Sequence, residues 1–143
     1  MDKLKEIYLT DTGRFNRLKY FKYLMLIAIV QAIAIGVSDA IFSDGYDSLT
    51  PIGCSFLNFI AAALLIPNYF IDVKRLQDFG QDSFLAKVSV ALSVYSVFFI
   101  EDLYELWGLF DYLVVIVNNI YALYILFKPG DVGENQYGPD PLQ

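Results

Sequence analysis

The sequence contains no histidine and a single cysteine, Cys54. Without histidine, the chain lacks the commonest protein ligand for metal ions and the usual proton shuttle of enzymes. A single cysteine excludes a disulfide within the chain. Paired catalytic carboxylates, a phosphate-binding loop and a nucleophile motif are missing as well. We therefore expect a protein that is not an enzyme and that holds neither a metal ion nor a cofactor.

Polar residues are also scarce, because 57% of the 143 residues are hydrophobic and the mean hydropathy is +0.48. Soluble domains contain about 45–50% apolar residues. The excess lies in four apolar stretches, residues 20–42, 51–70, 84–100 and 106–127. A helix needs roughly 20 residues to cross about 30 Å of hydrocarbon, and each stretch approaches this length, although the third is short and contains Lys87. We predict an all-α polytopic membrane protein, a bundle of four transmembrane helices.

Basic residues are missing from two of the three connections between these stretches, which carry acidic residues instead. The 10 Lys and Arg residues are Lys3, Lys5, Arg14, Arg17, Lys19, Lys22, Lys74, Arg75, Lys87 and Lys128. Because positive residues stay on the cytoplasmic side during insertion, we expect a bacterial inner-membrane protein with both termini in the cytoplasm. Residues 1–19 then form a cytoplasmic amphipathic lead, residues 20–127 the transmembrane domain, and residues 128–143 a cytoplasmic turn-rich tail.

Local signals predict where several of these segments begin and end. Three residues offer oxygen atoms that can cap a helix entering the first span: Thr10, Asp11 and Thr12. Pro67 lacks a backbone N–H and is expected to bend the second span near its inner end, and Gly80 offers a stop after it. The tail contains three prolines and three glycines, which exclude a regular helix. Two alternatives remain for the tail, an ordered strap on the inner face and a disordered end.

Amide side chains interrupt the apolar stretches at comparable depth. They are Gln31, Asn58, Asn118 and Asn119, and the third stretch adds Ser89, Ser93 and Ser96. In hydrocarbon such groups hydrogen-bond across helices. The layer is therefore either structural glue or a polar pathway through the bundle, and no acidic residue accompanies it to make it a proton route.

Three stretches share their order and spacing with a known family. They are GRFNRLKYF before the first span, LLIPNYFIDVKRLQDFGQDSF between the second and third spans, and KPGDVGENQYGPDP in the tail. Together they resemble the small bacterial inner-membrane family called domain of unknown function 805. The matching positions are Gly13, Arg14, Arg17, Pro67, Lys74, Arg75, Leu76, Asp78, Gly80, Gly130, Gly133, Asn135, Tyr137, Gly138, Asp140 and Pro141. The resemblance implies a four-span inner-membrane protein without an agreed biochemical activity.

Two positions depart from the family pattern. Gln77 stands where the family usually has His, and Phe84 stands where Trp is common. A role that requires titration of that imidazole is therefore excluded, whereas a hydrogen-bonding role at residue 77 can survive.

One polar segment, residues 72–82, contains seven charged or amide side chains in eleven residues. Asp72 and Asp78 each lie three residues from Arg75, a spacing that brings side chains together on a helix. We expect polar residues of the three family stretches to converge at the inner face: Arg14, Arg17, Arg75, Asp78, Asn135 and Asp140. Such a polar cap either satisfies itself and locks the helix ends, or binds an anionic lipid headgroup or a cytosolic partner.

Three classes of function compete. The favoured one is a non-enzymatic interaction or envelope-maintenance module, whose partners are membrane lipids, anionic lipids among them, and a second copy or another membrane protein. The alternative is a small oligomeric transporter or channel subunit, although four short helices are few and no inverted repeat is visible. A membrane enzyme acting on lipid lacks its catalytic motifs. Nucleic acid is not expected as a partner, because the inner basic residues are interleaved with nine acids.

Overall fold

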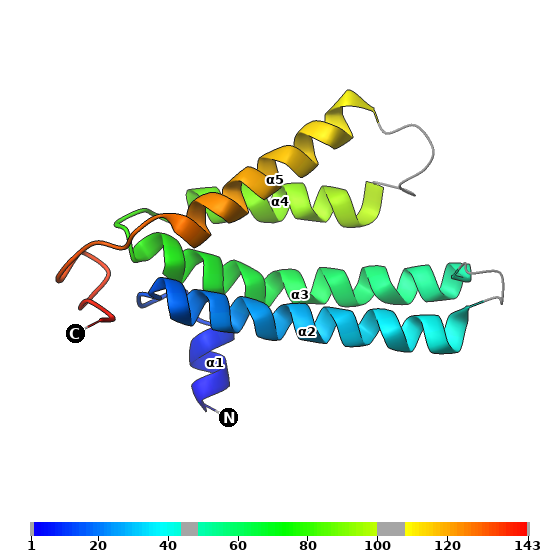
Figure 1. Ribbon diagram of the computed structural model, residues 1–143, viewed down its shortest axis with the longest axis horizontal. Helices are drawn as coiled ribbons and strands as arrows, with labels where there is room; N and C mark the ends of the chain where they lie inside the picture. The colour runs from blue at the N-terminus through cyan, green and yellow to red at the C-terminus, as the bar shows by residue number, and fades with distance from the viewer. Residues whose placement is uncertain (1, 44–48, 100–107, 143) are drawn as a thin grey trace.

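The computed structural model describes residues 2–43, 49–99 and 108–142. These residues form α1 (Asp2–Tyr8), α2 (Arg17–Phe42), α3 (Pro51–Gln77), α4 (Phe84–Phe99) and α5 (Leu109–Phe127). Figure 1 shows α2 and α3 as one antiparallel pair and α4 and α5 as a second, with the short α1 beside the first pair and roughly at right angles to it. The all-α prediction is confirmed for the described part of the chain.

The two ends of this arrangement differ. The cap end consists of the loop before α2, the last turns of α3 with the residues after it, and the tail (residues 9–16, 71–83 and 128–142). The far end consists of the opposite helix ends. In Figure 1 the two helix pairs lie together near the cap end and diverge toward the far end, and both termini lie in the half that contains the cap end.

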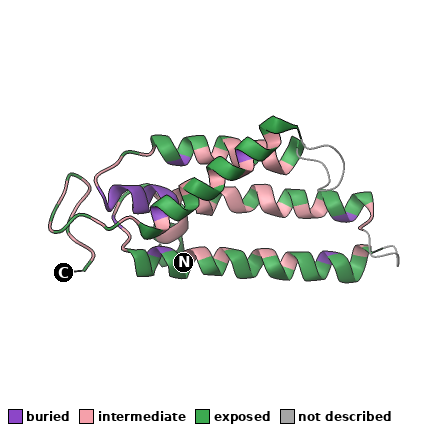
Figure 2. Ribbon diagram, turned by 45° about the horizontal axis from the view of Figure 1, so that its top comes forward, coloured by how far each residue is buried: buried purple, intermediate pink, exposed green. Residues whose placement is uncertain are grey.

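Three helices are long and apolar enough to cross a membrane, α2 with 26 residues, α3 with 27 and α5 with 19. The fourth, α4, has 16 residues. At about 1.5 Å per residue it spans about 24 Å, less than the roughly 30 Å of the hydrocarbon core. The helices expose apolar side chains along most of their length. Figure 2 colours the exposed residues of these helices green. The structure therefore supports three of the four predicted spans by length and composition, with a shorter apolar helix as the fourth.

A loop separates α1 from α2 in the N-terminal lead. Asn16 caps α2, since its side-chain oxygen accepts a hydrogen bond from the backbone N–H of Lys19 at 2.8 Å. The predicted capping residues lie in the loop instead, so the prediction is wrong for Thr10, Asp11 and Thr12. The reason is tertiary, because the loop is held by a hydrogen bond from the backbone N–H of Phe15 to the carbonyl of Lys74 at 3.1 Å.

The third helix is longer than the predicted second span, residues 51–70. Thr50 caps its start by accepting a hydrogen bond from the backbone N–H of Gly53 at 3.3 Å. The helix continues past Pro67, which lacks one donor but does not end it. Gly80, with a φ of +71°, provides the stop that the sequence predicts. The polar segment thus begins as the last turns of a helix, and its side chains point to several sides at once.

The predicted third and fourth stretches agree with α4 and α5 over the residues that the structure describes. Residue 100 and residues 106–107 lie outside them. Gly108 precedes α5 and donates its backbone N–H to the carboxylate of Asp111 at 2.8 Å, which ties down the start of the helix.

Candidate functional site

The longest run of consecutive buried residues in the described part of the chain is rich in polar side chains. Every residue from 71 to 79 is buried, and Figure 2 shows this segment in purple where α3 meets the cap end. Arg75 is 0% exposed, Lys74 1% and Asp78 3%. Buried charges are costly unless they are paired or hydrogen-bonded. The partners of these side chains therefore define the candidate site.

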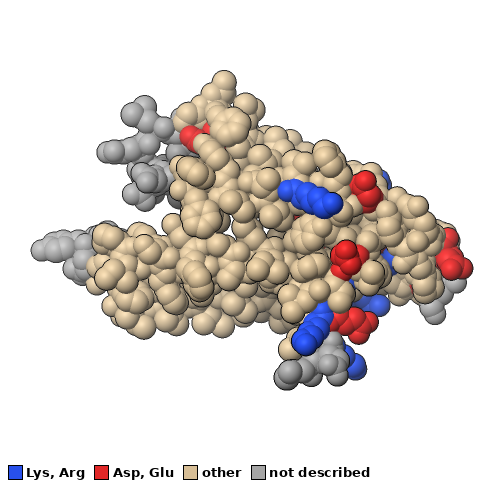
Figure 3. All heavy atoms as spheres, turned by 180° about the vertical axis from the view of Figure 1, so that it is seen from behind, with Lys and Arg blue, Asp and Glu red and all other residues tan. Residues whose placement is uncertain are grey.

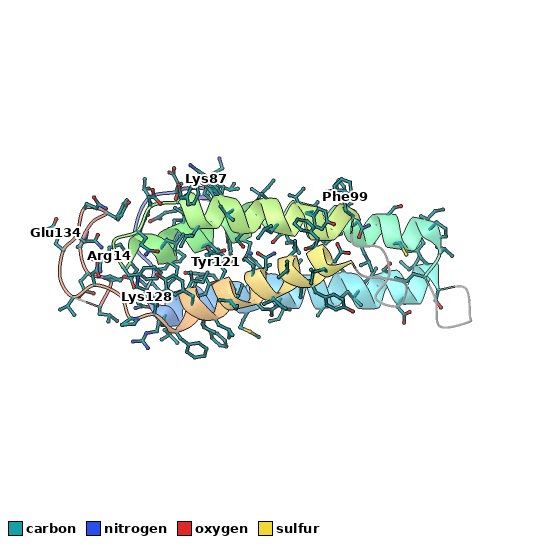
Figure 4. The ribbon with its side chains drawn as sticks, turned by 90° about the horizontal axis from the view of Figure 1, so that it is seen from above. Arg14, Lys87, Phe99, Tyr121, Lys128 and Glu134 are labelled. Carbon is teal, nitrogen blue, oxygen red and sulfur yellow. The ribbon has the colours of Figure 1, made fainter. Side chains whose placement is uncertain are left out.

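Arg14 reaches this segment from the loop before α2, and Figure 4 labels it at the cap end. It donates hydrogen bonds to the carboxylate of Asp78 at 3.3 Å and to the carbonyl of the same residue at 3.2 Å. Its other donors bind three carbonyls of the tail, those of Asp131 at 2.6 Å, Gly133 at 2.6 Å and Gly138 at 3.1 Å. A guanidinium has five N–H donors. All five are used, so Arg14 joins the N-terminal loop to α3 and to the tail.

Arg75 connects a different set of elements. Its Nε donates to the carbonyl of Ile125 in α5 at 2.8 Å, and one terminal nitrogen donates to the carbonyl of Phe15 at 3.2 Å. That nitrogen also lies 2.5 Å from a carboxylate oxygen of Asp78. The other terminal nitrogen donates to the carbonyl of Lys128. Arg75 therefore holds the end of α5 against the end of α3 and the N-terminal loop.

Asp78 lies between the two arginines and pairs with both. One oxygen faces Arg14 and the other faces Arg75, and the side chain is only 4% exposed. Burial raises the pKa of the Asp78 carboxyl, while the two guanidinium groups act in the opposite direction. With one carboxylate between two guanidinium groups, the three side chains keep a positive charge that the carbonyl oxygens around them stabilise.

The tail is shaped to receive these donors. Gly133 and Gly138 adopt positive φ values of 82° and 127°, and Asn135 and Gly138 exchange backbone hydrogen bonds at 3.1 and 3.0 Å. The carboxylate of Asp140 accepts the backbone N–H groups of Gly133 at 3.0 Å and Leu142 at 2.9 Å, which lowers its pKa. Asn135 donates to the carbonyl of Gln77 at 3.0 Å. Of the two alternatives for the tail, the structure shows the ordered strap.

Two further side chains tie the N-terminal residues to α3. The amine of Lys74 donates to the carbonyl of Ile7 at 2.8 Å and to that of Glu6, which caps the C-terminal end of α1. The amide of Gln77 donates to the carbonyl of Asp11 at 2.6 Å. Gln77 thus has the hydrogen-bonding role that the sequence leaves open at residue 77.

Sequence reasoning placed Asp72 beside Arg75, but the structure pairs it with a tyrosine. The hydroxyl of Tyr20 in α2 donates to the carboxylate of Asp72 at 3.1 Å, and both residues are buried. Neither ion pair in the described residues includes Asp72. The signal for this contact is weak in the sequence, because Tyr20 belongs to an aromatic cluster that also suits the membrane interface.

Arg17 lies at the edge of the hydrogen-bonded group formed by Arg14, Arg75 and Asp78. It is exposed and takes part in neither of the two ion pairs. It lines a cavity of about 450 Å³ together with Arg75, Asp78 and Asp140. The structure therefore brings the predicted site residues to one end of the molecule, where Arg17 is exposed while the others are buried or half-buried.

The predicted layer of amides does not form one group. Asn118 in α5 accepts from the hydroxyl of Ser89 at 3.1 Å and donates to that of Ser93 at 3.4 Å, both in α4. Asn119 is exposed and donates to the carbonyl of Val115 in its own helix at 2.8 Å. Asn58 is exposed on α3, and Gln31 lines a separate cavity between α2, α3 and α4. The expected bonds across helices form between Asn118 and α4, whereas Gln31, Asn58 and Asn119 do not join them, because adjacent or equally deep residues point to different sides of their helices.

The hydrogen bonds of this site connect segments that are far apart in the chain. Its two arginines donate nine hydrogen bonds, five from Arg14 and four from Arg75, to backbone carbonyls and to Asp78. In the described ranges, no group of three or more His, Cys, Asp or Glu side chains is placed to hold a metal ion. What the arrangement can do is hold the N-terminal loop, the ends of α3 and α5, and the tail as one unit.

Three helices long and apolar enough to cross a membrane, with the buried charged side chains of the described residues gathered at one end, are typical of an α-helical membrane protein. The sequence motifs whose residues lie at this end point to the family. The model of the family of proteins of unknown function DUF805 matches residues 8–139, and the chain belongs to this family. No curated protein and no solved structure gives a match.

Proposed function

We propose that this protein is a non-enzymatic module of the bacterial inner membrane, with both termini in the cytoplasm, that acts by binding anionic lipid at the cytoplasmic surface. The hydrogen bonds of Arg14, Arg75 and Asp78 hold the helix ends in place. The exposed basic residues around it supply the attraction for the lipid.

The observation that supports this proposal is a division among the 10 basic residues. Arg14, Lys74 and Arg75 are buried and bonded within the protein, and the amine of Lys128 lies over the ring of Phe79. Six others are exposed, and neither ion pair of the described residues includes them: Lys3, Lys5, Arg17, Lys19, Lys22 and Lys87. On the face shown in Figure 3, the basic atoms lie in the half toward the cap end. Each such residue near an anionic membrane contributes about 1 kcal/mol of attraction.

Lipid selectivity tests this proposal. The protein is reconstituted in vesicles with equal amounts of phosphatidylglycerol and phosphatidylcholine, extracted gently, and examined by native mass spectrometry. We expect phosphatidylglycerol to predominate among the retained lipids, and the triple variant Arg17→Gln, Lys19→Gln and Lys22→Gln to lose most of the preference. Equal retention of the two lipids by the unaltered protein would refute the proposal.

The cytoplasmic placement of the cap end has a separate test. Cys54 is the only cysteine, so Cys54→Ser gives a background without thiols. Gln136→Cys introduces a thiol on an exposed tail residue, and Ser43→Cys introduces one at the far end. We expect an impermeant maleimide to label residue 43 in intact spheroplasts and residue 136 only in inverted vesicles. The reverse pattern would contradict the orientation.

One observation favours a second candidate, the small transporter or channel subunit. A cavity of about 300 Å³ between α2, α3 and α4 is lined by Gln31 and Asn68. The side-chain oxygen of Asn68 is buried without a hydrogen-bond partner among the described residues. Flux of small polar solutes into vesicles distinguishes the candidates. A flux that exceeds that of protein-free vesicles and falls in Asn68→Leu would favour transport over lipid binding.

A further inference from the structure

A groove between α3 and α4 combines an apolar surface with a single basic residue. It has a volume of about 480 Å³. Its walls include Ala62, Ile66 and Tyr69 from α3, and Lys87, Val90 and Val94 from α4. Three and four residues separate these positions along each helix, so each wall is one helix face and the groove follows the helix axes. The shape suits an extended hydrocarbon chain that lies along the protein.

Lys87 lies at the end of this groove nearest the cap end, and Figure 4 labels it beside the first turns of α4. The residue is exposed, and neither ion pair of the described residues includes it. A basic residue in the first turns opposes the helix dipole, whose positive end lies there. Lys87 therefore does not stabilise the helix. An anion beside it would be attracted both by its amine and by the positive end of the helix dipole.

The acidic group close in sequence does not neutralise this charge by an ion pair. Asp82 precedes α4, and its carboxylate accepts the backbone N–H of Phe84 at 3.0 Å. The contact of Asp82 is thus with the start of the helix, while Lys87 lines the groove.

We infer that this groove binds an anionic phospholipid, with one acyl chain along α3 and α4 and the phosphate beside Lys87. The inference rests on the proposed function and names the site at which it operates. Charge complementarity selects the phosphate, and the apolar walls select a ligand that also carries a hydrocarbon chain. Tyr69 lies at the same end as Lys87, where aromatic rings suit the level of the lipid headgroups. A free phosphate ion would leave the apolar walls without a partner.

Native mass spectrometry of matched variants in the mixed vesicles described above tests the inference. Lys87→Gln removes the charge, and Lys87→Arg keeps it. Lys19→Gln removes an exposed charge that lies outside the groove. We expect Lys87→Gln to lower phosphatidylglycerol retention about fivefold, the factor that corresponds to about 1 kcal/mol per basic residue. Lys87→Arg should retain the lipid. Lys19→Gln should lower retention less than Lys87→Gln does, because Lys19 attracts the anionic surface without lining the groove.

A second pair of variants tests the apolar part of the site without changing any charge. Ala62→Phe fills the groove, and Ala32→Phe places the same ring on an exposed position of α2. We expect only Ala62→Phe to lower retention. Val94→Phe fills the groove from its other wall and replaces Ala62→Phe if that variant does not elute as a folded species.

The outcomes separate this inference from the proposed function. Equal losses in Lys87→Gln and Lys19→Gln, with no effect of either groove-filling variant, would overturn the groove site and leave general attraction of anionic lipid standing. Equal retention of both lipids by the unaltered protein would overturn both. Displacement of bound lipid by excess glycerol phosphate, which has the anion but no acyl chain, would show a phosphate site and overturn the assignment of a phospholipid.

Discussion

The cap end and the helix midsections of this protein use opposite kinds of residues for opposite purposes. At the cap end, residues 71–79 are all buried, and five of these nine are polar or charged. In the most apolar windows of α2, α3 and α5, no more than 11% of the residues are buried. Lipid tails are as apolar as leucine, so packing apolar helices together gains little in a membrane, whereas an unpaired polar group costs much. Specific contacts therefore concentrate where the chain is polar.

The largest expected effect comes from removing the carboxylate shared by the two arginines. Asp78→Ala leaves two guanidinium groups buried without their counter-ion, and loss of one partner of a buried ion pair costs about 3–5 kcal/mol. We expect a large drop in the free energy of unfolding in detergent, measured by thermal or chemical denaturation. Glu134→Ala, on an exposed tail residue labelled in Figure 4, is the control and should change stability by less than about 0.5 kcal/mol. Similar effects of the two variants would show that the ion pairs of Asp78 contribute nothing to the free energy of unfolding.

The same substitution at two isoleucines sharpens the comparison between the regions. Ile71 is 0% exposed and packs with Tyr20 and Ile125 in a cluster of buried hydrophobic residues. Ile33 on α2, by contrast, is 61% exposed. Ile71→Ala should destabilise the protein by about 2–5 kcal/mol, because it leaves a cavity. Ile33→Ala should have an effect below about 0.5 kcal/mol in the same detergent. Comparable losses at both positions would mean that the midsections are packed as tightly as the cap.

A pair of glycines tests the close approach of the tail to α3. A Cβ atom at Gly130 would lie 2.1 Å from a carboxylate oxygen of Asp78, while one at Gly36 in α2 would meet nothing within 4 Å. Gly130→Ala should therefore cost about 1–3 kcal/mol through overpacking. Gly36→Ala should leave stability unchanged or raise it by up to about 1 kcal/mol, since alanine favours the helix. Full stability of Gly130→Ala in thermal denaturation would argue against the close contact.

Two adjacent asparagines compare an interhelical hydrogen bond with an intrahelical one. Asn118 bonds to Ser89 and Ser93 of α4, whereas Asn119 bonds to its own helix. Asn118→Ala should lower stability by about 0.6–1.7 kcal/mol, the range measured for such bonds in membranes. The loss for Asn119→Ala should be smaller, because no helix contact depends on it. If Asn119→Ala proved the more damaging variant, the pairing of α4 with α5 would need another explanation.

The smallest effect concerns the pH dependence of the tail. Hydrogen bonds from Gly133 and Leu142 lower the pKa of Asp140, so the ionised form is favoured in the folded tail. The stabilisation is present above the ordinary pKa of about 3.9 and is lost as the pH falls through the lowered value. Hydrogen exchange at the backbone N–H of Gly133 should therefore show less protection in acid. Asp140→Asn should remove this pH dependence, and an unchanged acid response in that variant would assign it to another group.

The sequence was sufficient for much of the fold and for the location of the site. Hydropathy gave helix ends close to those of α4 and α5 within the described residues, and spacing placed Asp78 beside Arg75. It was insufficient at α3, because the apolar stretch ends near residue 70 while the helix continues through seven more residues, which find their partners in other segments. The capping residue of α2 was missed for a similar reason, since a contact with Lys74 holds the preceding loop.

The sequence by itself determined that this chain is a helical membrane protein whose basic residues gather at one end, because hydropathy and charge are properties that add up locally along the chain. The tertiary structure alone decided which groups the buried charges contact. Arg14 and Gly138 are 124 residues apart in the chain, yet a hydrogen bond of 3.1 Å joins them. Such a bond requires donor and acceptor to meet within about 3 Å in a suitable direction, and no local pattern encodes that meeting.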